Sequence, residues 1–398
     1  MSDAIVMAWA SARGTLGDMD ADVVRAVNDL TTRWARTLPA ENTVVAGLGL
    51  WPLLAILATG ADEPGRTELA TAAGVDPETG STDAIRLIEA IEASADLNAA
   101  LGVWVSEQLK LAESFDSVMP APLVGLLTGN PAVDKAKLDA WAAEHTDDLI
   151  REMPLDLDGD VMLVLASALL LRTTWVRPFT EQIRRVAGPW AGSWHWLERA
   201  DHDLDSVQRY DDLTVVTVRG DADVDVLLGI GDGDDVLPRL LDAAARPADG
   251  VPGSQLIAED EPGPGLRIGR TTASRPEVKV SLPSFSIEVE HDLLASRELF
   301  GLTAVTSDPG AHGHFSALSP TPLQVGQAKQ KVLARFFATG FEAAAVTAIA
   351  MTRAAMITRQ ERRLELTLDR PFAFTAVLRD SRLPIVAGWV ERPTEPGA

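Results

Sequence analysis

The stretch GFEAAAVTAIAM, residues 340–351, carries a single charged side chain in a chain whose formal net charge at pH 7 is -23. As a strand it would present two nearly apolar faces of mostly small side chains, because successive residues of a strand face opposite sides. That pattern is typical of a strand covered on both faces. Alanine, however, favours helices over strands. Three interpretations therefore stay open: a buried helix, a buried strand, and a mobile segment that becomes a strand.

The rest of the chain has a helical first part and a strand-rich second part. Apolar residues at helical spacing predict helices at 22–38, 48–59, 66–74 and 136–151. An apolar run predicts a strand at 161–171 that is buried on both faces. Further strands are predicted at 98–106, 213–218, 224–230, 278–290, 364–368 and 372–378, with helices at 235–245 and 291–300 and loops at 248–254 and 259–265. This order predicts an α+β fold in one large domain.

Composition excludes several functions. The chain has no cysteine, so a disulfide, a thiolate nucleophile and a cysteine-ligated metal are impossible. The negative charge argues against nucleic-acid binding and would repel anionic membranes. The sequence contains no apolar run of membrane-spanning length, and its first residues lack a basic leader. We therefore expect a cytoplasmic protein, with export by another route as the alternative.

Several patterns that resemble known sites fail on their spacing. The acidic stretch 155–162 lacks an acid at Ser167 or Leu169, where a calcium loop would need one. The stretch 229–235 has the wrong glycine spacing for a dinucleotide. His312 and His314 have no third ligand nearby in the sequence. With no GxSxG or HExxH motif either, we expect no enzyme activity, no cofactor and no metal site.

The opening stretch and its flanks resemble one protein family along most of the chain. GFEAAAVTA is similar to the proximal hinge of the serpins, which runs from a glycine through a glutamate to several alanines and a threonine. The resemblance extends, in the right order, to the segments 41–74, 101–115, 138–150, 163–179, 278–307 and 368–393. The last of these, for example, resembles the paired C-terminal strands of the family.

The resemblance implies a fold and a mechanism. It implies one serpin-like domain over 1–398, with three β-sheets, about eight or nine helices and an exposed reactive-centre loop at about 340–362. A target serine protease would cleave the loop and become acylated, and the loop would then insert into the large sheet as a new strand. The alternative is a non-inhibitory relative whose loop is only a substrate. Either protein is expected to be a monomer.

The family's usual spacing places the scissile bond in this sequence. Counted from the hinge glycine, the bond falls between Ala354 and Ala355, which suits an elastase-like or subtilisin-like protease. A shift by one residue would place it between Arg353 and Ala354, for a trypsin-like protease. Met356 is a third choice.

The resemblance also assigns residues to insertion and to opening of the sheet. Insertion would use Gly340, Phe341, Glu342, Ala343, Ala344, Ala345, Val346 and Thr347. Phe341 replaces the usual small hydroxyl residue, and its bulk is expected to slow insertion. Opening would involve Trp175, Ser167 and Gln330. The family's larger polar cluster is reduced here, because Ala46 and Gly49 stand at two of its positions, and Ser167 and Gln330 could still bond each other.

Overall fold

The computed structural model describes residues 19–92, 97–119, 123–155, 157, 162–308, 310, 313–341 and 360–394. The chain divides into two compact units, each assembled from three segments. The first takes Met1–Trp34, Ala46–Leu170 and Val289–Leu333; the second takes Ala35–Val45, Leu171–Glu288 and Ala334–Ala398. The prediction of one domain over the whole length stays a prediction.

The helices of the first unit follow the apolar patterns of the sequence. They are α2 (Ala21–Ala35), α3 (Gly47–Gly60), α4 (Gly65–Ala73), α5 (Gly80–Glu92), α6 (Phe115–Val118) and α7 (Pro131–His145). All residues of α3 except Thr59 are buried, which accounts for the apolar run at 48–59. The start of α7 lies upstream of the prediction because the Asn130 side chain accepts hydrogen bonds from the backbone N–H groups of Ala132 and Val133.

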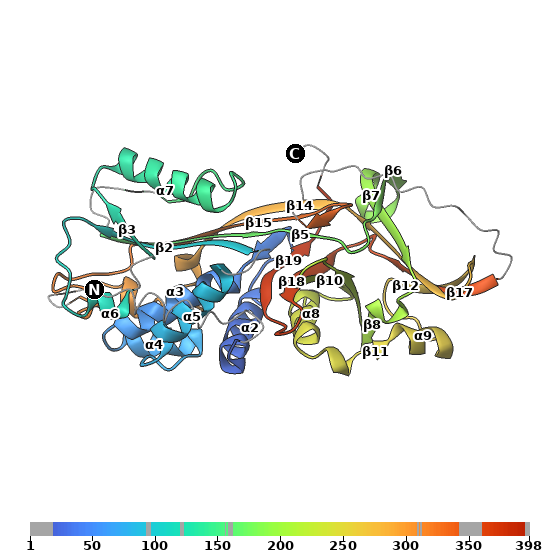
Figure 1. Cartoon of the computed structure of the whole chain (residues 1–398), viewed down its shortest axis with the longest axis horizontal. Coiled ribbons are helices and arrows are strands. Elements are labelled where there is room, and N and C mark those ends of the chain that lie inside the picture. Colours follow the sequence, from blue (N-terminus) through green and yellow to red (C-terminus); the bar gives the residue numbers. More distant parts are fainter. Residues whose placement is uncertain are drawn as a thin grey trace, which may run out of the picture. The chain divides into compact units, whose positions relative to one another are not determined.

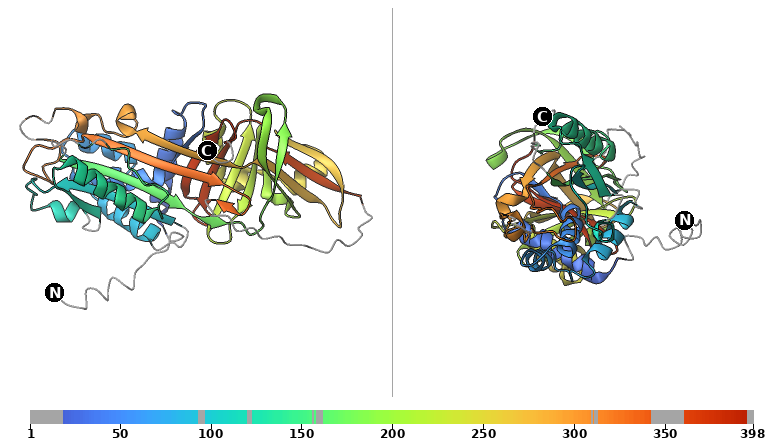
Figure 2. Two further views of the ribbon diagram at one scale, coloured as in Figure 1. Left: turned by 90° about the horizontal axis from the view of Figure 1, so that it is seen from above. Right: turned by 90° about the vertical axis from the view of Figure 1, so that its left-hand side faces the viewer.

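The sheet of the first unit has the order β3-β2-β4-β15. Its strands are β2 (Leu97–Ser106), β3 (Val124–Leu127), β4 (Leu163–Leu171) and β15 (Gln327–Phe336), and β14 (Phe285–Asp292) pairs with β15. Strands β4 and β15 run parallel, from Val164 opposite Gln327 to Leu169 opposite Val332 (Figure 2). The helix α7 covers one face of this sheet and α3–α5 lie on the other (Figure 1). The prediction of a strand buried on both faces is therefore confirmed for Leu163–Leu171, whereas residue 161 lies outside the described residues.

The second unit holds two complete sheets. One has the order β1-β19-β18-β10-β9-β8-β11 and the other β12-β17-β13-β7-β6. Their strands are β1 (Thr43–Val45), β6 (Thr180–Val186), β7 (Gly192–Asp201), β8 (Val207–Tyr210), β9 (Leu213–Arg219), β10 (Val224–Gly231), β11 (Val251–Pro252), β12 (Leu266–Thr272), β13 (Glu277–Pro283), β17 (Gln360–Thr367), β18 (Phe372–Leu378) and β19 (Pro384–Val390). Its α-helices are α8 (Val236–Ala245) and α9 (Gly253–Glu259). The described residues thus form eight α-helices, as expected.

Two local predictions are wrong. Residues 291–300 were expected to be helical, but the structure has the end of β14 followed by the short 3-10 helix Leu293–Ser296, which Asp292 caps. Residues 248–254 were expected to be a loop, but they contain a 3-10 helix (Pro247–Asp249), β11 and the start of α9. Buried Leu256 and Ile257 hold α9 in place. Tertiary packing thus overrides the local glycine and proline signals.

Candidate functional site

The start of the predicted hinge is already part of a sheet. Gly340 and Phe341 form the two-residue strand β16, which lies between the end of β15 and β5 (Thr173–Thr174). Phe341 is opposite Phe336 on one side and Thr173 on the other. Both pairings are antiparallel. The chain therefore enters the sheet at Gly340 with a defined register.

The bulky side chain of Phe341 is accommodated in this arrangement. It is 1% exposed, and its ring centroid lies 6.3 Å from that of Phe374. Phe374 in turn contacts Phe285, which stacks on Phe336. At β16 itself the ring is thus buried among other aromatic side chains. The aromatic ring anchors the first residues of the hinge.

Trp175 forms hydrogen bonds to the turn that leads into β16. Its indole N–H donates a hydrogen bond to the carbonyl oxygen of Phe337 (2.9 Å), and its backbone N–H donates to that of Thr339 (3.0 Å). The indole also lies against Phe336, with ring centroids 4.8 Å apart. The side chain is buried. Trp175 therefore fixes the backbone on both sides of residue 338, at the point where the hinge begins.

The central polar cluster differs from its prediction. The Gln330 side chain, 1% exposed, accepts a hydrogen bond from the backbone N–H of Ala46 (3.2 Å) and donates one to its carbonyl oxygen (3.0 Å). The bond that Gln330 and Ser167 could make is therefore not formed: both polar atoms of the carboxamide bond Ala46 instead. The hydroxyl of Ser167, 2% exposed, has no hydrogen-bond partner among the described residues.

Gly49 leaves the space in which the Ser167 hydroxyl lies. A Cβ atom on Gly49 would be 2.7 Å from the Ser167 oxygen, closer than real contacts allow, and 3.5 Å from Nε2 of Gln330. A buried hydroxyl without a partner costs about 1–3 kcal/mol. Such groups are rare, and each one calls for an explanation. Ser167 and Gln330 lie opposite each other across β4 and β15. Their positions in the sequence therefore gave no indication that the Ser167 hydroxyl would lack a hydrogen-bond partner.

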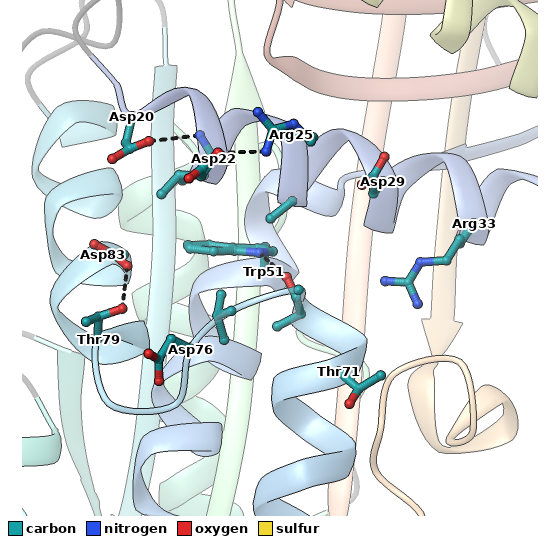
Figure 3. A pocket seen from close by; sticks show the side chains of 15 residues that line it. Asp20, Asp22, Arg25, Asp29, Arg33, Trp51, Thr71, Asp76, Thr79 and Asp83 are labelled. Carbon is teal, nitrogen blue, oxygen red and sulfur yellow. Dashed lines mark hydrogen bonds and ion pairs between the residues drawn. The ribbon is translucent and has the colours of Figure 1, made fainter.

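A cavity of about 790 Å³ in the first unit lies among α2, α3, α4 and α5 (Figure 3). Two pairs of its polar side chains bond each other: Asp22 pairs with Arg25 (2.6 Å), and Thr79 bonds Asp83 (3.1 Å). The indole N–H of Trp51 is bonded to the carbonyl oxygen of Ala73. Among the described residues no group of three histidines or acids is placed to hold a metal ion.

The remaining predicted residues lie outside the described part of the chain. They are Glu342 to Thr347 of the hinge, the candidate cleavage residues Arg353, Ala354, Ala355 and Met356, and His312. Within the described ranges, no helix combines the length and hydrophobicity needed to cross a membrane.

A model of one family, described as Serpin (serine protease inhibitor), matches residues 25–187 and 267–393. The chain belongs to the serpin family. It is 25% identical to serpin-Z6C of Oryza sativa subsp. japonica, over 89% of this chain and 92% of that protein. It is 23% identical to a serine proteinase inhibitor of Cavia porcellus, over 83% of this chain and 75% of that protein. Serpins are in general inhibitors of serine proteases and not enzymes.

Solved structures confirm the serpin fold. The thermophilic serpin tengpin in its native state matches with a TM-score of 0.71 and 16% identity, over 94% of this chain and 95% of that one. A thyroxine-binding globulin in complex with thyroxine matches with a TM-score of 0.68 and 18% identity, over 94% and 99%. At these identities the likeness concerns the fold alone.

Proposed function

We propose that this serpin inhibits a serine protease as a suicide substrate. The protease cleaves the segment after β16, and the freed upstream part extends β16 between β15 and β4. The observation that supports this proposal is the place of Gly340 and Phe341, which already pair with β15 and β5. Strand addition can continue from there, because β16 supplies the first pair of the ladder and so removes the need to find a register.

Extending β16 in its register gives each hinge residue a partner. With Phe341 opposite Phe336, Ala345 comes opposite Val332 and Thr347 opposite Gln330. With Phe341 opposite Thr173, Thr347 comes opposite Ser167. The two pairings agree, because Ser167 and Gln330 are already opposite each other. In the inserted state we therefore expect Thr347 between them, with its hydroxyl available to the unpartnered hydroxyl of Ser167.

The same register assigns the two faces of the inserted strand. The buried residues of β15 are those in register with the odd-numbered hinge residues, since its burial alternates. Ala343, Ala345 and Thr347 would therefore face the core, where small side chains fit between existing strands. Glu342 and Ala344 would face the other side. A charge in the hinge is thus tolerable at position 342, because it would not enter the core.

The target protease follows from the cleavage position. Cleavage between Ala354 and Ala355 would suit an elastase-like or subtilisin-like protease, and cleavage between Arg353 and Ala354 a trypsin-like one. The experiment incubates the protein with pancreatic elastase, subtilisin and trypsin in turn, followed by denaturing gels and mass spectrometry. We expect a covalent complex of summed mass with one of them, and a released C-terminal peptide whose first residue defines the bond.

A second candidate is a serpin that binds without inhibiting. The observation that favours it is the pair of hydrogen bonds between Gln330 and Ala46, which hold the middle of β15 to the start of α3 and oppose any movement of β15. The thyroxine-binding globulin is an example of this fold in complex with a small molecule. Clean nicking in the same experiment, with the protease left active and no gain in thermal stability, would favour this candidate over the inhibitor.

A further inference from the structure

The strand β6 is an open edge of the five-stranded sheet. Within the described residues it pairs only with β7, and six of its seven residues are exposed. Ile183, in the middle of β6, is 75% exposed. This is the largest exposed fraction among the large apolar side chains of the described residues. An edge strand leaves backbone N–H and C=O groups free to pair with another strand. The side of β6 away from β7 is therefore an edge to which another strand can pair.

The sequence of β6, TEQIRRV, is complementary to itself. If two copies pair antiparallel around Ile183, that residue lies opposite its own copy. Glu181 then lies opposite Arg185, and Arg185 opposite Glu181, so the same ion pair occurs twice. Directly opposite residues share a face of the sheet, and opposite charges there are favourable. Gln182 lies opposite Arg184, and this pair adds neither a charge attraction nor a charge repulsion.

Symmetric registers centred on the neighbouring residues are less favourable. A two-fold axis through Glu181 would place two carboxylates opposite each other, and an axis through Arg184 or Arg185 would place two guanidinium groups opposite each other. An axis through Gln182 leaves Glu181 opposite Ile183. The register centred on Ile183 therefore combines an apolar centre with matched charges. In the registers centred on a charged residue the same side chains would repel each other, so the charges favour the register centred on Ile183.

The charged groups of this register are accessible. Arg185 is exposed and makes no ion pair or side-chain hydrogen bond within the described residues. The Glu181 carboxylate contacts Nδ1 of His195 on β7 through one oxygen and is 42% exposed, so its other oxygen can accept from an arginine. Ile183 lies opposite His195 in the β6–β7 ladder. A docked copy would therefore continue this ladder on the open side.

We propose that β6 joins two copies of this chain in a two-fold symmetric dimer, with Ile183 on the axis and Glu181 paired with Arg185 of the other copy. The contact is isologous, because the same patch serves both partners. This differs from the monomer expected from the sequence. A strand of seven residues buries little area, so the dimer forms reversibly and its population depends on concentration.

Sedimentation velocity over a concentration series tests the proposal with the full chain. We expect the wild type to shift from monomer to dimer as concentration rises. Ile183→Asp should weaken the dimer by about tenfold or more, since it places two carboxylates on the axis. Val133→Asp is the matched control, because Val133 is 51% exposed on α7 and should leave the dimer unchanged.

Charge reversal tests the register itself. Glu181→Arg alone and Arg185→Glu alone should each weaken the dimer, since each places like charges opposite each other twice. The double variant E181R/R185E restores both pairs and should restore the dimer. Circular dichroism would verify that all variants are folded. A wild type that stays monomeric throughout the series would overturn the proposal, and so would a double variant weaker than both single variants.

Discussion

At the scale of single residues, the most informative group is the Ser167 hydroxyl, which is buried without a partner among the described residues. In the proposed inserted state it lies opposite Thr347. The hydroxyl would then cost free energy in the uncleaved protein and contribute a hydrogen bond in the cleaved one. Ser167 would thus increase the free energy released when the hinge inserts into the sheet.

Ser167→Ala tests this role. It should leave the uncleaved protein equally or more stable, because removal of an unsatisfied group is neutral or favourable. It should lower the stability of the cleaved protein by about 1 kcal/mol, the net value of one hydrogen bond. Urea unfolding before and after cleavage measures both effects.

Thr347→Val is the matched partner for this test. It should destabilise the cleaved protein by a similar amount, and the double variant should cost no more than either single variant, since both remove one interaction. If Ser167→Ala destabilised the uncleaved protein as much as the cleaved one, the hydroxyl would have another role.

At the scale of secondary-structure elements, the extension of β16 predicts a difference between neighbouring hinge positions. Ala345→Arg would bury an unpaired charge on the core face, opposite Val332, and should convert the inhibitor into a substrate. Ala344→Arg, on the opposite face, should preserve most of the inhibition. The measurement is the number of inhibitor molecules consumed for each protease molecule inactivated. Equal effects of the two variants would argue against this register.

The strand β17, which follows the cleavable segment, is held on both sides. It pairs antiparallel with β12 and parallel with β13. Arg267 pairs with Glu365, and Nε of Arg363 donates to Glu277 (2.6 Å). The two ion pairs differ in exposure: the Arg267 side chain is 79% exposed, whereas those of Arg363 and Glu277 are 23% and 11% exposed.

These two pairs should differ in their contribution to stability. Arg363→Met should cost about 3 kcal/mol, because it leaves the Glu277 carboxylate buried without its partner. Arg267→Met should cost roughly 1 kcal/mol or less, because exposed pairs contribute little. Chemical denaturation measures both. A similar loss in the two variants would mean that the Glu277 carboxylate finds other compensation.

Long apolar elements could be predicted from the sequence, whereas elements held by tertiary contacts could not. The strands β10 and β18 are buried at every position, and their runs of apolar residues identify them. The strand β15 has no such run of apolar residues, because charged residues alternate with buried ones along most of it. Its Lys329 and Lys331 pair with Asp292 and Glu290 of β14. In the candidate site, the positions of Ser167 and Gln330 could be predicted, but the bonds of Gln330 to Ala46 depend on packing.

At the scale of the whole molecule, cleavage between Phe341 and Gln360 should raise the temperature of unfolding. The inserted strand adds backbone hydrogen bonds along β15 and β4, each with a net contribution of about 1 kcal/mol. For a chain of this size, several such bonds would correspond to a shift of roughly 10 °C. Scanning calorimetry of the intact and nicked protein measures it. An unchanged unfolding temperature would contradict insertion, whatever the target protease.

Phe341 already pairs with both neighbouring strands, and this affects the kinetics of the proposed insertion. The strand to be added is covalently joined to a residue that already occupies its place, so no second molecule has to be encountered. Growth of the ladder from β16 should therefore follow first-order kinetics, with a half-time that does not change when the protein is diluted. Association through β6 requires an encounter between two molecules and slows on dilution, so a dilution series separates the two events in time.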